Sequence, residues 1–234
     1  MRLCIIRHGD PDYQRDCLTE AGNVEAAALA DYLADIEIDR IFASPLGRAQ
    51  ETAAIAARKL GQTATTMEWL QELPAHQLPM SELMFWDIHG HQVRTTAYLD
   101  DPNNWRTITE LAQLAEIDLD NLYKTLIEHS DAFLASLGYD REGPVYRVRQ
   151  RNELKIAVVC HGGFGLTWMA HLLAIPLPLM WSSFFLHTTS VSTILFDERT
   201  LEIAVPRCIG LGEVAHLYHQ QIAPGTSGIK ANYY

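Results

Sequence analysis

The chain has few cysteines, an excess of negative over positive charge, and no long hydrophobic run. Its four cysteines in 234 residues show no CxxC spacing, which argues against a disulfide-dense secreted scaffold and a thiolate metal site. No apolar stretch approaches the roughly 18 residues of a membrane-spanning helix. With 29 acidic and 18 basic side chains, the formal net charge is −11, and such a surface repels nucleic acid and anionic membranes. We therefore expect a cytoplasmic protein with neither nucleic acid nor membrane as a partner, and no signal peptide before the strand-like residues 1–6.

Several catalytic signatures are also missing. A cysteine phosphatase needs an arginine six positions after its nucleophile, but after the four cysteines those positions hold Asp10, Asn23, Leu166 and Val214. No G-x-S-x-G elbow marks a serine hydrolase. No HExxH or comparable ligand spacing supports a metal site, so metal binding is not expected at His76, His89 and His91. Three cysteines in or beside apolar runs are expected to be small buried residues: Cys4, Cys160 and Cys208.

Strand and helix signals alternate along much of the chain. Apolar runs predict strands over 1–6, 36–43, 63–67 and 156–160, and apolar stripes predict helices over 21–33, 45–60, 119–137 and 163–173. Residues 191–196 and 201–205 predict a hairpin. The alternation predicts a three-layer α/β/α fold, in which a mostly parallel sheet carries helices on both faces. We expect a single domain over residues 1–234.

Local signals refine this prediction. Ser44 is expected to cap the second helix, with Pro45 in its first turn and Gly61 at its end. Residues 74–150 contain prolines and aromatics with little periodicity, and we expect them to form a specificity insert over the carboxyl edge of the sheet. The tail after Pro224 is expected to be flexible.

Two histidine–glycine pairs, RHG at 7–9 and HGG at 161–163, each follow a strand-like run. Because ligands of open α/β sheets bind at the carboxyl edge of the strands, His8 and His161 are placed to face one another across one site. A histidine can attack a phosphoryl group through a neutral ring nitrogen when a hydrogen bond holds the other nitrogen. Gly9 lets the backbone approach a substrate, and Arg7 offers a planar fork of donors for phosphate oxygens.

Two further side chains fit such a site. Arg48 lies in the first turn of a predicted helix at the same edge, where its guanidinium and the helix dipole both favour an anion. Glu72 follows the third predicted strand and is a candidate acid for protonating a leaving alkoxide, with Glu68 as its competitor. Taken singly, Arg48 also fits an exposed helical arginine, and either glutamate fits a solvated loop residue.

Taken together, these blocks resemble the histidine phosphatase superfamily, whose fold is that of phosphoglycerate mutase. The resemblance rests on LCIIRHGDPDY, LTEAG, IFASPLGRAQETA and VVCHGGFG, and it extends to HTTSVSTILFD and the pair His216-Leu217. It implies that His8 is the phosphorylated nucleophile and that Glu72 is the proton donor. It also implies a phosphate pocket that needs no metal and no cofactor, built from Arg7, Gly9, Arg48, His161 and Gly162.

The chain departs from the mutase pattern in two places. Asp10, Pro11 and Asp12 follow RHG, where mutases carry Glu or Gln and then Asn, and PAHQLPMSELMFWD replaces a glycine-rich, tryptophan-containing segment. Both departures favour a phosphatase acting on a small phosphorylated metabolite through a phosphohistidine. The alternatives are a phosphoglycerate-mutase-type phosphotransferase and a non-catalytic phosphate-binding module.

Overall fold

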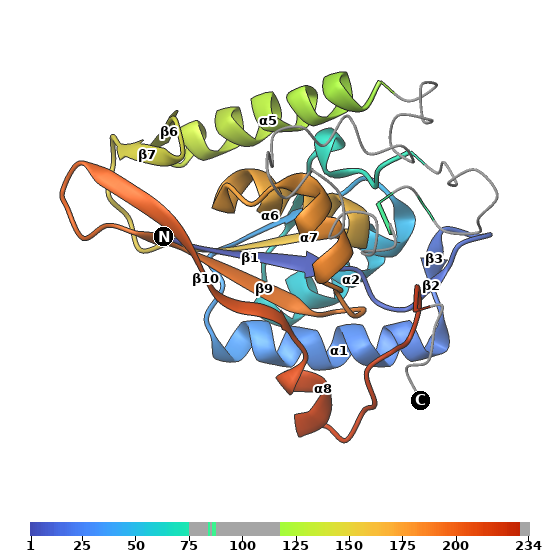
Figure 1. Cartoon of the computed structure of the whole chain (residues 1–234). Helices are drawn as coiled ribbons and strands as arrows, with labels where there is room; N and C mark the ends of the chain where they lie inside the picture. The colour runs from blue at the N-terminus through green and yellow to red at the C-terminus, as the bar shows by residue number, and fades with distance from the viewer. Residues whose placement is uncertain (75–83, 85, 88–117, 230–234) are drawn as a thin grey trace.

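The computed structural model describes residues 1–74, 84, 86–87 and 118–229. In these residues a central sheet lies between two layers of helices (Figure 1), which confirms the predicted fold class. One face carries α1 (Glu20–Asp35) and α2 (Gly47–Leu60), with α8 (Ala215–His219) packed on α1. The other face carries α5 (Leu119–Ser136), α6 (Gly162–Leu173) and α7 (Leu177–Ser183). Among the described residues, no helix combines the length and apolarity that crossing a bilayer requires.

The main sheet has a parallel half and an antiparallel half. The parallel strands, in spatial order, are β5 (Ala64–Thr66), β4 (Arg40–Ala43), β8 (Lys155–Cys160) and β1 (Arg2–Arg7). The sheet continues with antiparallel strands β9 (Val191–Asp197), β10 (Ile203–Glu213), β7 (Val145–Val148) and β6 (Tyr139–Glu142). A short ladder of β2 (Pro11–Asp12) and β3 (Cys17–Leu18) stands beside it, and a 3-10 turn, η1 (Glu68–Leu70), follows β5.

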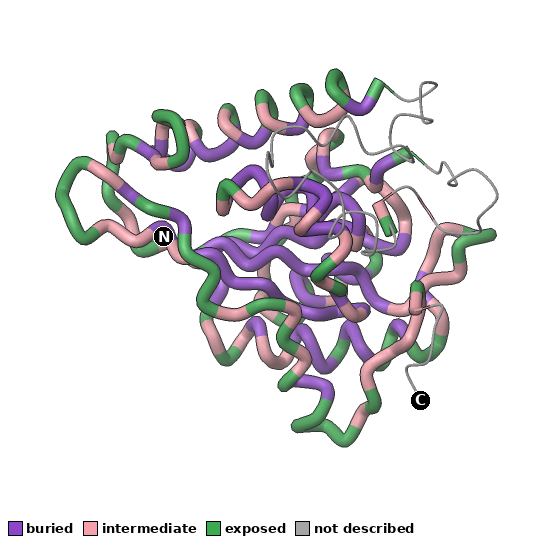
Figure 2. Tube along the Cα trace, in the orientation of Figure 1, coloured by how far each residue is buried: buried purple, intermediate pink, exposed green. Residues whose placement is uncertain are grey.

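The central strands are buried (Figure 2). They are covered on both faces, because their side chains alternate between two hydrophobic cores. In β1, Leu3 and Ile5 join the core under α5 and α6, whereas Cys4 and Ile6 join the core under α1 and α2. The second core is rich in alanine, so both helices approach the sheet closely. These continuous apolar runs are typical of parallel strands covered on both sides.

Two local predictions need correction. Residues 36–39 were expected to begin a strand, but α1 continues to Asp35, Ile36 follows it as the C-cap, and β4 begins only at Arg40. Ser44 was expected to cap α2, yet the N-cap residue is Leu46, whose side chain makes no capping hydrogen bond, and the first amide of the helix, on Gly47, donates instead to Asp16 Oδ2 at 2.7 Å. Gly61 does end α2, in a left-handed conformation with φ of 65° that glycine adopts readily. The hairpin of β9 and β10 is confirmed, with a longer second strand than expected.

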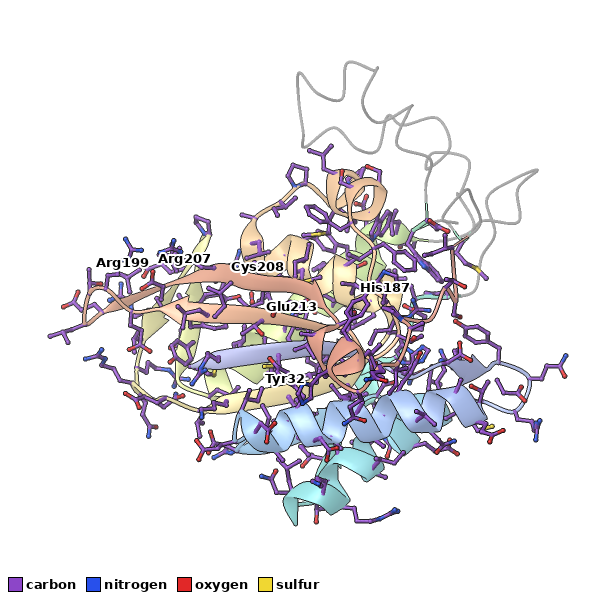
Figure 3. All side chains as sticks on the ribbon, turned by 90° about the horizontal axis from the view of Figure 1, so that it is seen from below. Tyr32, His187, Arg199, Arg207, Cys208 and Glu213 are labelled. Carbon is purple, nitrogen blue, oxygen red and sulfur yellow. The ribbon has the colours of Figure 1, made fainter. Side chains whose placement is uncertain are left out.

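The predicted insert and tail contribute structure of their own. Within residues 118–150, α5 packs against α6 and β6, and the β6–β7 hairpin extends the sheet beside β10. The tail after Pro224 was expected to be flexible, and within it Gly225 accepts a hydrogen bond from His187 Nδ1 at 3.0 Å. Figure 3 labels His187 in this region.

The cysteine prediction holds for two of its three members. Cys4 and Cys160 are buried, whereas Cys208 is exposed. In Figure 3, Cys208 lies on β10, to one side of the helices α1 and α2. These helices cover the parallel strands and leave Cys208 uncovered. The apolar neighbours of Cys208 therefore do not place it in the core.

Candidate active site

The two predicted histidines meet at the carboxyl ends of neighbouring strands. Arg7 at the end of β1 lies opposite Cys160 at the end of β8, and the His8 amide donates to the Cys160 carbonyl at 3.0 Å. The imidazole rings of His8 and His161 have their centroids 5.2 Å apart. Both side chains are buried, so the parallel pairing of β1 and β8 creates a single two-histidine site.

Two hydrogen bonds define the tautomer of His8. Its Nδ1 lies 2.7 Å from the carbonyl oxygen of Gly9, which can only accept, so Nδ1 carries the proton. Its Nε2 accepts from Nε of Arg48 at 3.2 Å, and a guanidinium can only donate. Nε2 therefore holds a lone pair, as a nucleophilic imidazole requires.

Burial and positive neighbours keep both imidazoles neutral. Burial is the largest cause that lowers the pKa of His8 well below its usual 6.5, with Arg7 and Arg48 adding to it and the Gly9 hydrogen bond opposing it. The pKa of His161 is lowered well below the same value, first by burial and then by His8, Arg48 and Arg7. Desolvation and like charge both disfavour the protonated form.

The two arginines are held by groups outside the histidine pair. Arg7 Nη1 donates to the carbonyl oxygens of Leu186 at 2.6 Å and Ser227 at 3.1 Å. Arg48 forms an ion pair with Asp16, and its guanidinium lies 5.4 Å from the ring centroid of Tyr13. These contacts fix the guanidinium planes before any ligand binds.

Buried donors remain available at the centre of the site. Among the described residues, Arg7 Nε and His161 Nδ1 are buried nitrogens without a hydrogen-bond partner. A Cβ added to Gly162 would lie 3.6 Å from Arg7 Nε, so this glycine leaves room beside the guanidinium. Buried polar groups are rarely left unpaired in proteins, and an oxyanion bound here would pair them.

Ser44 is a site residue that sequence reasoning misassigned. Its Oγ lies 2.7 Å from Nε2 of His161 and accepts the Leu46 amide at 3.3 Å. The Ser44 hydroxyl can donate its own proton to His161 Nε2, and in that tautomer Nδ1–H of His161 is a donor toward the site. Ser44 directly follows β4, so the strand order of the sheet is the signal that places it here.

Glu72 lies at the N-terminus of α6, beside the same site. Its carboxylate accepts the amides of Phe164 at 2.7 Å and Gly163 at 3.2 Å. Burial raises the pKa of Glu72, and these amide hydrogen bonds and Arg7 oppose the rise. Its competitor Glu68 is exposed in η1. Glu72 therefore has the environment of a carboxyl that holds its proton longer than usual.

The three histidines at which metal binding is not expected, His76, His89 and His91, lie outside the described residues. In the part of the chain that the structure does describe, no three His, Cys, Asp or Glu side chains are grouped to hold a metal ion.

Comparison with known protein families gives a match over most of the chain. The model of the histidine phosphatase superfamily (branch 1) matches residues 3–208. The chain belongs to the histidine phosphatase superfamily.

Two curated relatives match shorter stretches of this superfamily member. Fructose-2,6-bisphosphatase TIGAR B of Danio rerio is 37% identical over 76 residues, which cover 28% of this chain and 30% of the relative. An uncharacterized Mycobacterium tuberculosis protein is 62% identical over 67 residues, which cover 23% of this chain and 32% of the relative. The chain thus spans about a third of the length of each.

Solved structures share the fold over nearly the whole length of this histidine phosphatase superfamily member. Phosphoserine phosphatase of Entamoeba histolytica, in complex with 3-phosphoglyceric acid, has a TM-score of 0.62 at 20% identity and covers 92% of this chain and 98% of its own. A mycobacterial glucosyl-3-phosphoglycerate phosphatase with VO3 has a TM-score of 0.59 at 19% identity, covering 91% and 99%. The α-ribazole phosphatase of Shigella flexneri scores 0.58 at 23% identity, covering 91% and 96%. At these identities the similarity establishes the fold.

Proposed function

We propose that this histidine phosphatase superfamily member hydrolyses phosphomonoesters without a metal ion, through a phosphohistidine on His8. The observation that carries the proposal is the tautomer of His8, whose Nε2 lone pair is fixed by the Gly9 carbonyl on one side of the ring and Arg48 on the other. A neutral, preoriented imidazole beside buried cationic donors suits nucleophilic attack on phosphorus.

The reaction proceeds in two steps. First, His8 Nε2 bonds to phosphorus, the ester P–O bond breaks, and the leaving alkoxide takes a proton from Glu72. A water molecule then attacks phosphorus, gives its proton to the Glu72 carboxylate, and the P–N bond breaks to release phosphate and neutral His8. Burial, which raises the pKa of Glu72, favours the protonated form that the first step needs.

The phosphoryl oxygens are bound by Arg7, Arg48 and His161, with room left by Gly9 and Gly162. The two buried nitrogens noted above, Arg7 Nε and His161 Nδ1, support this assignment. On substrate binding, Arg48 Nε moves its hydrogen bond from His8 Nε2 to a phosphoryl oxygen. Each charge-assisted contact contributes on the order of 1.5–3 kcal/mol, which offsets the repulsion from an acidic protein surface.

The substrate class is a small phosphorylated metabolite in the cytoplasm rather than nucleic acid. The formal net charge of −11 supports this choice, because an acidic envelope disfavours a polyanion. The named relatives are phosphatases of fructose 2,6-bisphosphate, phosphoserine and glucosyl-3-phosphoglycerate. We place selection among such metabolites in the insert, residues 74–150.

The test is turnover of an aryl phosphate in excess chelator by the wild type, His8→Ala and the matched control His219→Ala, whose histidine is exposed on α8. We expect hydrolysis to survive the chelator, to persist in the control and to vanish in His8→Ala. Rapid quench with radiolabelled substrate is expected to trap acid-labile phosphate on His8. Loss of activity with chelator contradicts the mechanism, as does hydrolysis without label. Bisphosphate-dependent isomerisation of phosphoglycerate points to a mutase, and binding without turnover to a binding module.

A further inference from the structure

The peptide between Gly9 and Asp10 is hydrogen-bonded at both of its polar atoms. Its carbonyl oxygen, on Gly9, accepts the Nδ1 proton of His8 at 2.7 Å. Its N–H, on Asp10, donates to Oε2 of Glu25 at 2.9 Å. A single peptide plane therefore connects a carboxylate to the imidazole that the proposed function makes the nucleophile.

Glu25 is a buried side chain on α1 that the proposed chemistry leaves unused. Only 3% of its surface is exposed. Its second oxygen, Oε1, accepts the Thr188 hydroxyl at 2.9 Å, and a Cβ added to Gly225 would lie 2.9 Å from the same oxygen. Both carboxylate oxygens are thus engaged, and Glu25 is held against the peptide rather than turned to solvent.

We infer that Glu25 is a positioning residue for phosphoryl transfer, acting on His8 through the Gly9–Asp10 peptide; this rests on the proposed function of His8. A carboxylate that accepts an amide N–H polarises the amide and increases the negative charge on its carbonyl oxygen. That oxygen then binds Nδ1–H more strongly. As Nε2 bonds to phosphorus, the ring becomes positive and Nδ1–H becomes a better donor, so this hydrogen bond strengthens in the transition state.

The alternative role for Glu25 is a mechanical bridge. Through Thr188 it ties α1 to the turn at 187–190, and in that turn the Thr189 amide donates to the His8 carbonyl at 3.2 Å. A bridge depends on the Thr188 contact, whereas polarisation depends on the charge at Oε2. Glu25→Gln removes the charge and keeps an acceptor for the Asp10 amide, and Thr188→Val removes the bridge and keeps the charge.

The experiment measures labelling of His8 by radiolabelled aryl phosphate in a single turnover, in the wild type and both variants. We expect Glu25→Gln to slow His8 phosphorylation roughly threefold to tenfold with KM unchanged, and to move the His8 Nδ1 proton resonance upfield. Thr188→Val is expected to leave the rate within about twofold of the wild type, since it leaves the charge of Glu25 and the hydrogen bond from the Asp10 amide to Oε2 in place. Equal losses in both variants, or a wild-type rate in Glu25→Gln, overturn the inference. Absence of label on wild-type His8 instead overturns the proposed function.

A titration of the wild type keeps the inference testable if Glu25→Gln does not fold. Burial raises the pKa of Glu25; the Thr188 hydroxyl, the Asp10 amide and Arg7 lower it, and the Asp10 charge raises it. We expect the His8 Nδ1 proton resonance to move upfield together with the Glu25 carboxyl signal as the pH falls through the pKa of Glu25. A Nδ1 resonance that ignores this titration overturns the inference.

Discussion

His8 is neutral in this protein because its surroundings disfavour a second proton. Burial and the charges of Arg7 and Arg48 lower its pKa well below 6.5. Only the neutral ring has a lone pair on Nε2, so the proposed mechanism predicts that activity is lost as the pH falls through this lowered pKa. We expect kcat/KM to stay on its plateau down to a pH well below 6.5. The acid limb, in which kcat/KM falls, is expected only at still lower pH.

Removing Arg48 tests this explanation at a single residue. Arg48→Ala takes away one positive neighbour, so the pKa of His8 rises and the acid limb of kcat/KM moves toward pH 6.5. Loss of a charge-assisted contact also lowers kcat/KM by roughly tenfold to a hundredfold. The matched control is Arg58→Ala on the same helix, where the arginine is exposed. An acid limb that stays in place in Arg48→Ala contradicts the electrostatic account.

His216 makes a second pH-dependent contribution, to stability rather than catalysis. This buried residue stacks on Tyr32 with ring centroids 5.8 Å apart, and Figure 3 labels Tyr32 on α1. Burial lowers the pKa of His216 from 6.5 to about 4, so below pH 6.5 the unfolded chain takes up this proton before the folded one. The free energy of unfolding therefore falls between pH 6.5 and about 4, by up to roughly 3 kcal/mol from this group.

Denaturant unfolding across pH measures this contribution. We expect His216→Gln to lose the part of the pH dependence between 6.5 and about 4 that the wild type shows. The exposed His219 on the same helix gives the control His219→Gln, which is expected to keep the wild-type slope. Parallel curves for the wild type and His216→Gln rule out a buried neutral His216.

At the residue scale, the sequence predicts groups that follow a motif and misses those defined by distant partners. His8, His161, Arg7 and Arg48 follow strand ends or a helix start, and the structure brings them together. Ser44 resembled a helix cap because Pro45 follows it, yet its hydroxyl contacts His161, 117 positions away. The role of Glu25, which lies in an alanine-rich helix, is not visible in the sequence, because its partner Thr188 lies 163 positions away. Local patterns do not contain such pairings.

At the scale of elements, the first turn of α1 packs directly on the loop that follows His8, the proposed nucleophile. A Cβ added to Gly22 would lie 2.2 Å from the Asp10 carbonyl oxygen, so Gly22→Ala forces the helix and the loop apart. We expect a loss of about 1–3 kcal/mol of stability and a lower kcat, because residues 8–10 move with the loop. Thermal melts and initial rates check both effects. Val24→Ala, at an exposed site of the same helix, is expected to change neither, and an unaffected Gly22→Ala disproves the tight packing.

Elements with strong periodicity or clear breakers were predictable, and weakly patterned ones were not. The strands β1 and β8 are apolar runs, and α2 ends at a glycine as its sequence indicates. The strand β6 has the sequence YDRE with a single buried residue, so it lacks the apolar alternation that marks a strand. Helix α7 spans only seven residues and begins beside Pro176 and Pro178. In the sequence, two prolines so close together indicate an interruption of regular structure rather than the start of a helix.

At the scale of the whole molecule, the proposed phosphate site predicts that bound phosphate stabilises the folded chain by mass action. Inorganic phosphate at about 100 times its Kd is expected to raise the free energy of unfolding by about 2.7 kcal/mol. For a chain of this size that corresponds to roughly 5–10 °C in melting temperature. Chloride at equal ionic strength is the control, and Arg48→Ala is expected to lose most of the shift. A shift of equal size with chloride indicates general screening of the acidic surface instead of a site.

The hydrogen bond from Arg7 to the Ser227 carbonyl has a practical consequence for anyone who fuses this protein to a reporter. A purification tag joined after residue 234 follows the segment that helps to orient the Arg7 guanidinium, to which the proposed function assigns phosphate binding, so we expect such a tag to perturb ligand affinity without unfolding the protein. The β9–β10 connection, where Leu201 is exposed, lies at the amino end of the parallel strands, opposite His8. Labels and surface-attachment handles belong at that connection.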